Sequence, residues 1–442
     1  MRPSRVLMVS PHFPPDSSAA AHRVRLLAPH LAEFGWEPTI VAVDPRDCEG
    51  RLDPGLERLV PPDLRIIRCR AWPVRWTRRI GVGDLGLRAW HGLRRTCTRL
   101  LRQERFDALF ITVYPVYPAR LGRILKRRFG VPFVLDYQDP WVGAWGLSVG
   151  GGPGGAPDLK SRISRQLGRM LEPGAVRAAD AITAVSAGIC EEIARRIPDA
   201  STRPQAVIPL GWEPCDFAGL DSTGRNRWFD PADGQVHLCY VGTLLPTGFE
   251  TLRLLLTAVA RLRDREPDLY ARLQLWFLGT SNQSSGTAPD RVRPLAEALG
   301  VAARVHEVPA RVPYLEALAV LTQADGILLL GNTEPHYTAS KLCPALLARR
   351  PLLALFHDAS SVVEILRRAG REPTVRVVTY DAGHPPMTRL DAATDALAAL
   401  IRRPAYGSSD VDLGAIEDVS ARGGARALAG LLDRVTGRGP AA

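Results

Sequence analysis

The chain has 442 residues, 46% of them apolar, which exceeds what one hydrophobic core usually holds and predicts two domains. Its net charge of +11 is local, because twelve arginines and only two acids lie between Arg65 and Arg105 and the other 401 residues together carry +1. No nucleic-acid motif accompanies this charge and no apolar run reaches the roughly 18 residues of a membrane span, so we expect neither a nucleic-acid-binding protein nor an integral membrane protein.

The first predicted element is a buried strand, Val6–Ser10, followed by the loop Pro11–Ala21 and a helix over Arg23–Phe34. Small residues in the loop let backbone or ligand approach the next helix, as at the start of an α/β binding cleft. His12 follows the strand directly, and we predict that it faces this cleft as a candidate catalytic residue.

The segment 65–105 combines a predicted amphipathic helix, Asp84–Arg105, with Trp72, Trp76 and Trp90. A basic amphipathic element with interfacial aromatics suits an anionic membrane surface. An ordinary surface helix of an arginine-rich protein is the alternative, and the sequence leaves both open.

Strands alternate with helix-length segments along both halves of the chain, which is typical of parallel sheets built from βαβ units. In the first half we predict strands at 6–10, 39–43, 65–69, 108–113, 133–135, 181–185 and 206–210, and in the second at 237–241, 273–278, 304–308, 326–330, 352–356 and 375–379. These indicate an α/β protein with two Rossmann-like domains facing across a cleft, one over 1–212 and one over 235–410. We expect the final segment, 411–442, to supply a helix at Ile416–Val435 that packs back on the first domain.

Several common catalytic motifs are absent from the sequence: GxGxxG after the first strand, the P-loop and HExxH. We therefore look to the loops at the carboxyl ends of the strands, where open parallel sheets bind ligands. The glycine-rich run Gly150–Gly155 has the composition of a mobile loop or a simple connector.

Lys341 is one of only three lysines among 57 basic residues, and it follows Thr338 and Ser340 at a predicted helix start. Free N–H groups, the helix dipole and an ammonium together favour an anion there. A solvated surface lysine is the alternative.

Asp136 and Asp139 follow the apolar strand residues 133–135. A carboxylate at this position can accept a proton from a hydroxyl or orient a sugar, so both are candidate catalytic residues. The alternative is turn capping before Pro140.

Taken in order, a series of segments resembles the GT-B glycosyltransferases, and most closely their family 4 retaining enzymes. The segments, spread over about residues 5 to 370, are the N-terminal strand with its Pro-Pro-Asp loop, VPFVLDYQDPW, AADAITAVSAGI, VIPLGW, YVGTLLP, LWFLGT, ARVHEVP through ADGILLL, and TASKLCPALLARRPLLAL.

The resemblance implies metal-independent transfer of a sugar, with retention, from a nucleotide-sugar donor to a hydroxyl acceptor, in surface polysaccharide or glycoconjugate biosynthesis. It places the acceptor on the N-terminal domain, where Ser17 and Ser18 stand at the family's glycine pair, and the donor on the C-terminal domain. The predicted donor contacts are Gly242, Thr243, Gly279, Thr280, His306, Glu307, Thr338, Ser340 and Lys341.

The sequence departs from the family at the two glutamates, whose positions correspond to His336 and Pro344, and no cation follows Gly242. We therefore predict that Lys341 supplies the cation for the donor diphosphate. Two other functions stay open: a degenerate non-catalytic GT-B subunit, and a sugar-nucleotide epimerase.

No cofactor or metal is expected, and the acceptor is a sugar, a lipid-linked molecule or another small molecule. The scattered cysteines and the lack of a signal peptide predict a cytoplasmic protein, with the segment 65–105 as the part that contacts the inner face of the membrane.

Overall fold

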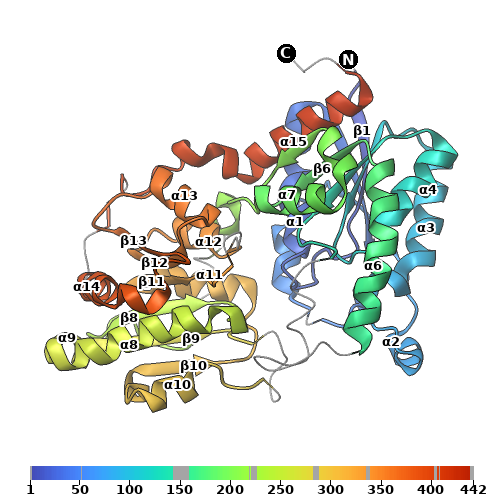
Figure 1. The fold of residues 1–442 in the computed structure, drawn as a ribbon. Helices are drawn as coiled ribbons and strands as arrows, with labels where there is room; N and C mark the ends of the chain where they lie inside the picture. Colours follow the sequence, from blue (N-terminus) through green and yellow to red (C-terminus); the bar gives the residue numbers. More distant parts are fainter. Residues whose placement is uncertain are drawn as a thin grey trace. The chain divides into compact units, whose positions relative to one another are not determined.

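The computed structural model of the chain contains two compact units, one of Met1–Gly211 with Asp418–Ala442 and one of Trp212–Glu417 (Figure 1). The residues described are 2–50, 52–142, 159–218, 220, 226–281, 288–334, 339–402, 406–407 and 409–438. The loop 150–155, His336 and Thr338 lie outside them.

The first unit holds a seven-stranded parallel sheet in the order β3-β2-β1-β4-β5-β6-β7. Its strands are nearly all apolar because both faces are covered by helices. They are β1 (Ser4–Val9), β2 (Trp36–Val43), β3 (Arg65–Cys69), β4 (Ala108–Thr112), β5 (Phe133–Tyr137), β6 (Ala181–Ala184) and β7 (Gln205–Val207).

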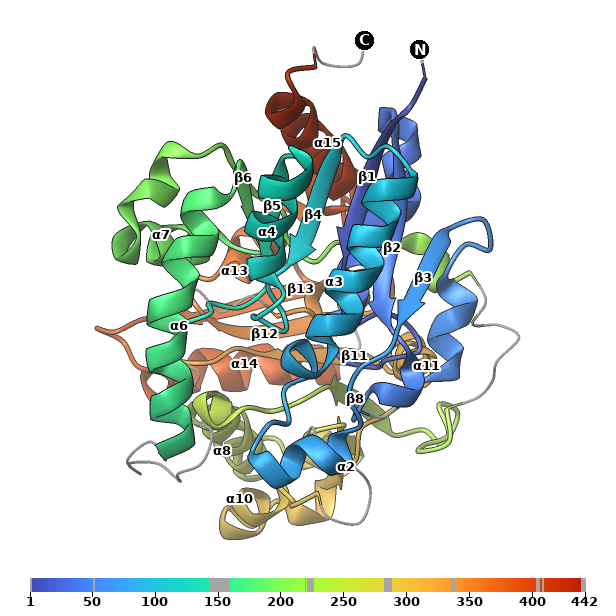
Figure 2. The same ribbon diagram turned by 90° about the vertical axis from the view of Figure 1, so that its right-hand side faces the viewer.

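One face of this sheet packs against α3 (Leu85–Gln103), α4 (Ala119–Phe129), α6 (Leu159–Ala178) and α7 (Ala187–Arg196). Figure 2 views this layer from outside, with α2 (Val74–Thr77) lying beyond the carboxyl ends of the strands. The other face packs against α1 (Ala21–Leu27), the 3-10 helix Ala28–Phe34 and α15 (Ala421–Thr436).

The second unit holds a six-stranded parallel sheet in the order β10-β9-β8-β11-β12-β13. The strands are β8 (Val236–Val241), β9 (Leu273–Leu278), β10 (Val305–Val308), β11 (Gly326–Leu330), β12 (Leu352–His357) and β13 (Val375–Tyr380). The helices are α8 (Phe249–Arg265), α9 (Pro267–Arg272), α10 (Arg293–Ala298), α11 (Tyr314–Gln323), α12 (Leu342–Leu347), α13 (Ser361–Ala369) and α14 (Leu390–Ile401). The predicted α/β class with two Rossmann-like domains is confirmed.

Two helices differ in the structure from the predicted ones, one in its type and one in its first residue. The helix predicted over Arg23–Phe34 becomes a 3-10 helix from Ala28, where Pro29 removes a backbone donor. The helix predicted from Ile416 begins only at Ala421, because the Ser420 side chain caps it by accepting the Gly423 N–H. This helix, α15, belongs to the first unit, and its Asp433 accepts the indole N–H of Trp36 on β2 at 3.0 Å.

A buried ion pair joins three parts of the first unit. The Arg23 guanidinium donates to both oxygens of Asp136, at 2.6 Å and 3.0 Å, and also to the carbonyl of Ile208. The Asp136 carboxylate also accepts the Thr183 hydroxyl of β6 at 2.7 Å. Both charges are fully buried, so each depends on the other for solvation. We therefore assign Asp136 to holding the sheet together, rather than to contact with a substrate.

Asp136→Asn should lower the free energy of unfolding by about 3–5 kcal/mol, because it leaves the Arg23 charge buried without its counter-ion. Thr183→Val, which removes one neutral donor from the same carboxylate, should cost only about 1 kcal/mol. Urea unfolding of both variants compares their losses in free energy of unfolding. An Asp136→Asn protein as stable as the parent would contradict the structural assignment.

Candidate functional site

Several of the candidate site residues lie at the topological switch points of the two sheets. In each sheet the first and fourth strands are neighbours, β1 beside β4 and β8 beside β11, and ligands of open parallel sheets bind at the carboxyl edge beside such a pair. His12 follows β1 and Tyr114 follows β4, whereas Gly242 follows β8 and Lys341 lies in the connection after β11.

In the second unit, loops from three strands are linked to one another at this edge. Leu244 donates its N–H to the carbonyl of Thr280 at 2.9 Å, and Thr333 donates to the carbonyl of Thr247 at 3.3 Å. The Asn332 amide reaches the Thr247 hydroxyl at 3.3 Å. The loops after β8, β9 and β11 therefore form one connected rim.

Lys341 lies across this rim. Its ammonium donates to the Tyr240 hydroxyl and to the carbonyl of Thr243 (3.0 Å), and its nitrogen is 4.0 Å from the centre of the Tyr240 ring. The Lys341 stem passes over Gly242, where a Cβ would stand 2.6 Å from its Cε and where φ is +127°. Gly242 is thus needed for the backbone conformation and for the close approach of the lysine.

Burial lowers the pKa of Lys341 to about 7. Its partners are a hydroxyl, a carbonyl and an aromatic face, none of which carries a full negative charge. An anion bound beside the ammonium would restore the charged form, so the arrangement is suited to a phosphate group.

The Gly242 N–H extends the sheet by donating to the carbonyl of Leu278 at 2.7 Å, so the predicted contact of Gly242 with the donor, which stays a prediction, would not use this N–H. The Thr243 N–H has no acceptor among the described residues. Ser340 is exposed directly before Lys341, and Thr338 lies outside the described part of the chain.

Glu307 and Thr280 hold the loop that leads into α10. The buried Thr280 hydroxyl donates to Glu307 at 2.6 Å, and the same carboxylate accepts the backbone N–H groups of Arg291, Val292 and Arg293, each at 2.9 Å. Gly279, with φ +73°, makes the turn before Thr280. These contacts give Glu307 the role of a helix cap, and its predicted contact with the donor stays a prediction.

His306 lies inside β10, so its side chain points from a face of the sheet rather than from the carboxyl edge. Its ring stacks on Trp276 with centroids 4.1 Å apart, and its Nε2 is 2.7 Å from the Gln274 side-chain oxygen. Burial and the neighbouring His237 lower the pKa of His306. This environment favours a neutral, packed imidazole.

In the first unit, the loop after β1 holds a histidine and an aspartate that the sequence analysis did not pair. His12 Nδ1 is 2.5 Å from the buried Asp16 carboxylate, and the His12 ring lies 5.5 Å from that of Tyr114. Burial opposes ionisation of Asp16, but hydrogen bonds from His12 and the Ser18 N–H outweigh it and lower its pKa. A carboxylate on Nδ1 leaves Nε2 as the proton acceptor of a neutral imidazole.

The remaining candidates flank this pair. Ser18 binds Asp16 through its N–H, and its buried hydroxyl has no hydrogen-bond partner among the described residues. Ser17 is partly buried beside it, and Asp139 is exposed beyond the end of β5.

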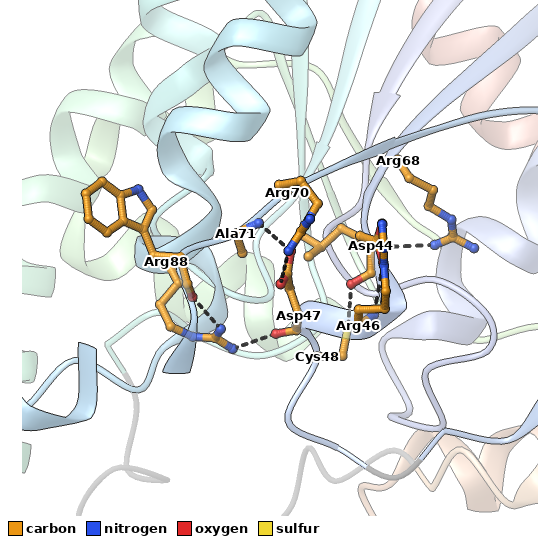
Figure 3. A network of polar contacts seen from close by, with 10 residues as sticks. Asp44, Arg46, Asp47, Cys48, Arg68, Arg70, Ala71 and Arg88 are labelled. Atoms are coloured by element: carbon orange, nitrogen blue, oxygen red, sulfur yellow. Dashed lines mark hydrogen bonds and ion pairs between the residues drawn. The ribbon is translucent and has the colours of Figure 1, made fainter. Parts of the chain in front are cut away.

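Half of the twelve arginines of the basic segment 65–105 bind carboxylates or backbone carbonyls of the protein. Arg88 is buried and donates to the carbonyls of Trp72 (2.9 Å) and Asp47 (3.0 Å), while Arg70 binds the Asp47 carboxylate (Figure 3). Arg65, Arg68, Arg78 and Arg105 also bind acids or carbonyls. The surface arginines without an acidic partner among the described residues are Arg75, Arg79, Arg94, Arg95, Arg99 and Arg102.

Within the described ranges, no helix is long and apolar enough to cross a bilayer. The same ranges hold no cluster of three or more His, Cys, Asp or Glu side chains arranged to bind a metal ion.

The first unit is similar in sequence to known proteins. Residues 18–211 match the family described as the glycosyl transferase 4-like domain. A D-inositol 3-phosphate glycosyltransferase of Geodermatophilus obscurus is 30% identical over 194 residues, which are 43% of this chain and 40% of that relative. The match therefore spans about two fifths of the relative's length.

Solved structures extend the similarity of fold to both units. Anabaena Alr3699/HepE in complex with UDP and glucose has a TM-score of 0.61 at 13% identity, with 98% of this chain and 100% of that chain covered. A trehalose-phosphate synthase from Burkholderia vietnamiensis has a TM-score of 0.60 at 13% identity, with 98% and 99% covered. The predicted GT-B fold is confirmed.

Asp16→Asn in the first unit should reduce stability near neutral pH by about 1–2 kcal/mol. The folded pKa of Asp16 lies below 3.8, so its stabilisation is present above about pH 4 and is lost as the pH falls through the lowered value. The variant should therefore show a flatter loss of stability below pH 4 in urea unfolding. Asp63→Asn, an exposed control in the same unit, should stay within about 0.5 kcal/mol of the parent, and equal acid sensitivity of parent and Asp16→Asn would contradict the pairing.

Lys341→Met should make the ligand-free protein more stable near pH 7. With a pKa of about 7 folded and 10.5 unfolded, Lys341 binds more protons in the unfolded chain between these values, so stability rises with pH across that window. The thermal midpoint of the variant at pH 7 should be about 2–4 °C higher than that of the parent. The increase of stability with pH between about 7 and 10.5 should be absent from the variant. Lys126→Met should instead lower the thermal midpoint, because the Lys126 ammonium forms an ion pair with Asp180 at 2.6 Å. A lower midpoint for Lys341→Met would show that its charge is not destabilising.

Proposed function

We propose that this protein is a glycosyltransferase that moves a sugar from a nucleotide-diphosphate donor to a hydroxyl acceptor. The observation that carries the proposal is Lys341, a half-buried lysine whose ammonium is held against the rim of the second unit without an anionic partner among the described residues. The glycosyl transferase 4-like domain and the UDP-bound structural neighbour support the same reaction class.

The chemistry follows from where charge develops. Cleavage of the bond between sugar and phosphate leaves negative charge on the phosphate and positive character on the sugar ring. A cation already fixed at the phosphate lowers this barrier most, since it needs no reorganisation. We assign Lys341 and the Thr243 N–H to the donor phosphates, with no metal required.

We propose retention at the anomeric carbon, as the resemblance to family 4 implies. The departing phosphate oxygen then receives the acceptor proton, so no strong base is needed. In this scheme His12, held by Asp16, and the Ser18 hydroxyl orient the acceptor hydroxyl, and Asp139 is a further candidate contact.

We further propose a role in surface polysaccharide or glycoconjugate biosynthesis at the inner face of the membrane. Trp72 and Trp76 are 54% and 57% exposed, and Arg75 lies over the Trp76 ring. Exposed indoles beside unpaired arginines suit the boundary between headgroups and acyl chains. A sugar or lipid-linked acceptor at that surface is the expected partner.

Lys341→Ala should abolish sugar transfer while leaving the fold intact. Thermal shifts of the parent with UDP, GDP, ADP and dTDP compounds identify the donor, because binding to the folded state raises its midpoint, and the variant should lose that shift. Transfer is then measured with the donor found, and the anomeric configuration of the product is read by NMR.

Near-normal turnover by Lys341→Ala would overturn the assignment. A parent that shifts with no nucleotide would favour the non-catalytic subunit. A changed sugar after incubation with donor alone would indicate an epimerase. Lys126→Ala is the matched lysine control and should keep the nucleotide response.

A further inference from the structure

Helix α6 carries an exposed apolar strip that the sequence analysis did not single out. Ile163, Leu167 and Met170 are 52%, 40% and 69% exposed. Their spacing of four and three residues places them on one face of the helix. Three large apolar side chains side by side on a surface mark a contact site more often than a chance arrangement.

The opposite side of α6 is fixed by packing, so the strip cannot turn inward. Gly168 is buried, and a Cβ there would stand 2.8 Å from Val142 Cγ2. Farther along, Ala175 and Val176 are buried in the core of the first unit. The helix is therefore anchored with its apolar strip outward.

The charge around the strip has one sign. Between Leu159 and Leu171 the sequence contains four cations and no acid. Arg162 and Arg169 are exposed on this helix and have no acidic partner among the described residues. An apolar strip bordered by arginines alone complements a surface that is anionic outside and apolar beneath.

The strip belongs to the same helical layer as the exposed tryptophans. Figure 2 shows α6, α4 and α3 side by side on one face of the first sheet, with α2 at the end of the layer from which the strands' carboxyl ends emerge. Figure 1 shows the amino-terminal half of α6 reaching toward that same end. Two separate elements of one unit therefore present apolar side chains and unpaired arginines.

We propose that α6 and α2 together seat the first unit on an anionic lipid bilayer, with Ile163, Leu167 and Met170 entering the headgroup region beside Trp72 and Trp76. This inference rests on the membrane association proposed above and adds a second element to it. Two contact elements restrict rotation about either one, so the carboxyl edge that holds His12 and Asp16 keeps a defined orientation to the surface. A membrane-resident acceptor would then meet the site from a constant direction.

Vesicle co-sedimentation of the full chain tests the proposal. The parent should bind vesicles of phosphatidylcholine with phosphatidylglycerol and bind neutral phosphatidylcholine much less, because cations near an anionic surface add to apolar insertion. The triple variant Ile163→Ser/Leu167→Ser/Met170→Ser should lower the bound-to-free ratio about tenfold or more. Arg162→Gln/Arg169→Gln should lower it several-fold, and only on anionic vesicles.

Matched controls separate insertion from general changes of the surface. Val207→Ser removes an apolar side chain that is 46% exposed on β7 of the same unit, and Arg58→Gln removes an exposed arginine; both should bind like the parent. The thermal midpoint of the triple variant should be unchanged, as should its nucleotide shift, because Lys341 lies in the other unit.

The outcomes distinguish the two proposals. If Trp72→Ser/Trp76→Ser loses binding but the α6 triple variant keeps it, the role of α6 is overturned and the earlier membrane proposal stands. If the parent binds no vesicle, both membrane proposals fail while the donor proposal is untouched. If the parent is a dimer in solution and the triple variant a monomer, a second copy covers the strip and the inference is overturned.

Discussion

The constraint on which the structure depends is that all strands of each sheet run parallel, so every connection must cross a face and every strand ends at the same edge. With the first and fourth strands as neighbours, the outgoing chains separate and leave room between them. His12 with Tyr114 and Gly242 with Lys341 both occur at such a point. The sheet topology thereby brings together loops that are distant in sequence.

The Lys341 ammonium lies in an environment in which its charge destabilises the ligand-free protein. Lys341 receives a carbonyl, a hydroxyl and an aromatic face in exchange for water, and its pKa falls to about 7. The same desolvation strengthens its attraction for an anion, since charges interact more strongly away from water. The buried Arg23 and Asp136 show the opposite solution, because each charge there already has its counter-ion and no capacity to bind a ligand remains.

The sequence was a good guide to the elements and a poorer guide to side chains. All thirteen predicted strands are present, since a buried parallel strand is a short apolar run whatever surrounds it. The burial of Arg88 was not predicted, because a helical pattern cannot show that two backbone carbonyls lie within reach of its guanidinium inside the protein. Asp16 was missed because it is four residues from His12 in a loop, where no periodicity relates them.

By itself the sequence determined the α/β class, the two Rossmann-like domains, the resemblance of the chain to GT-B glycosyltransferases, and Lys341 as an unusual residue in an arginine-rich chain. Only the tertiary structure decided which charges are neutralised inside, which backbone donors the sheet consumes, and which apolar side chains stay outside. The physical reason is that strand formation follows from local hydrophobicity, whereas burial and hydrogen-bond partners depend on chain segments distant in sequence that pack together only in the folded protein.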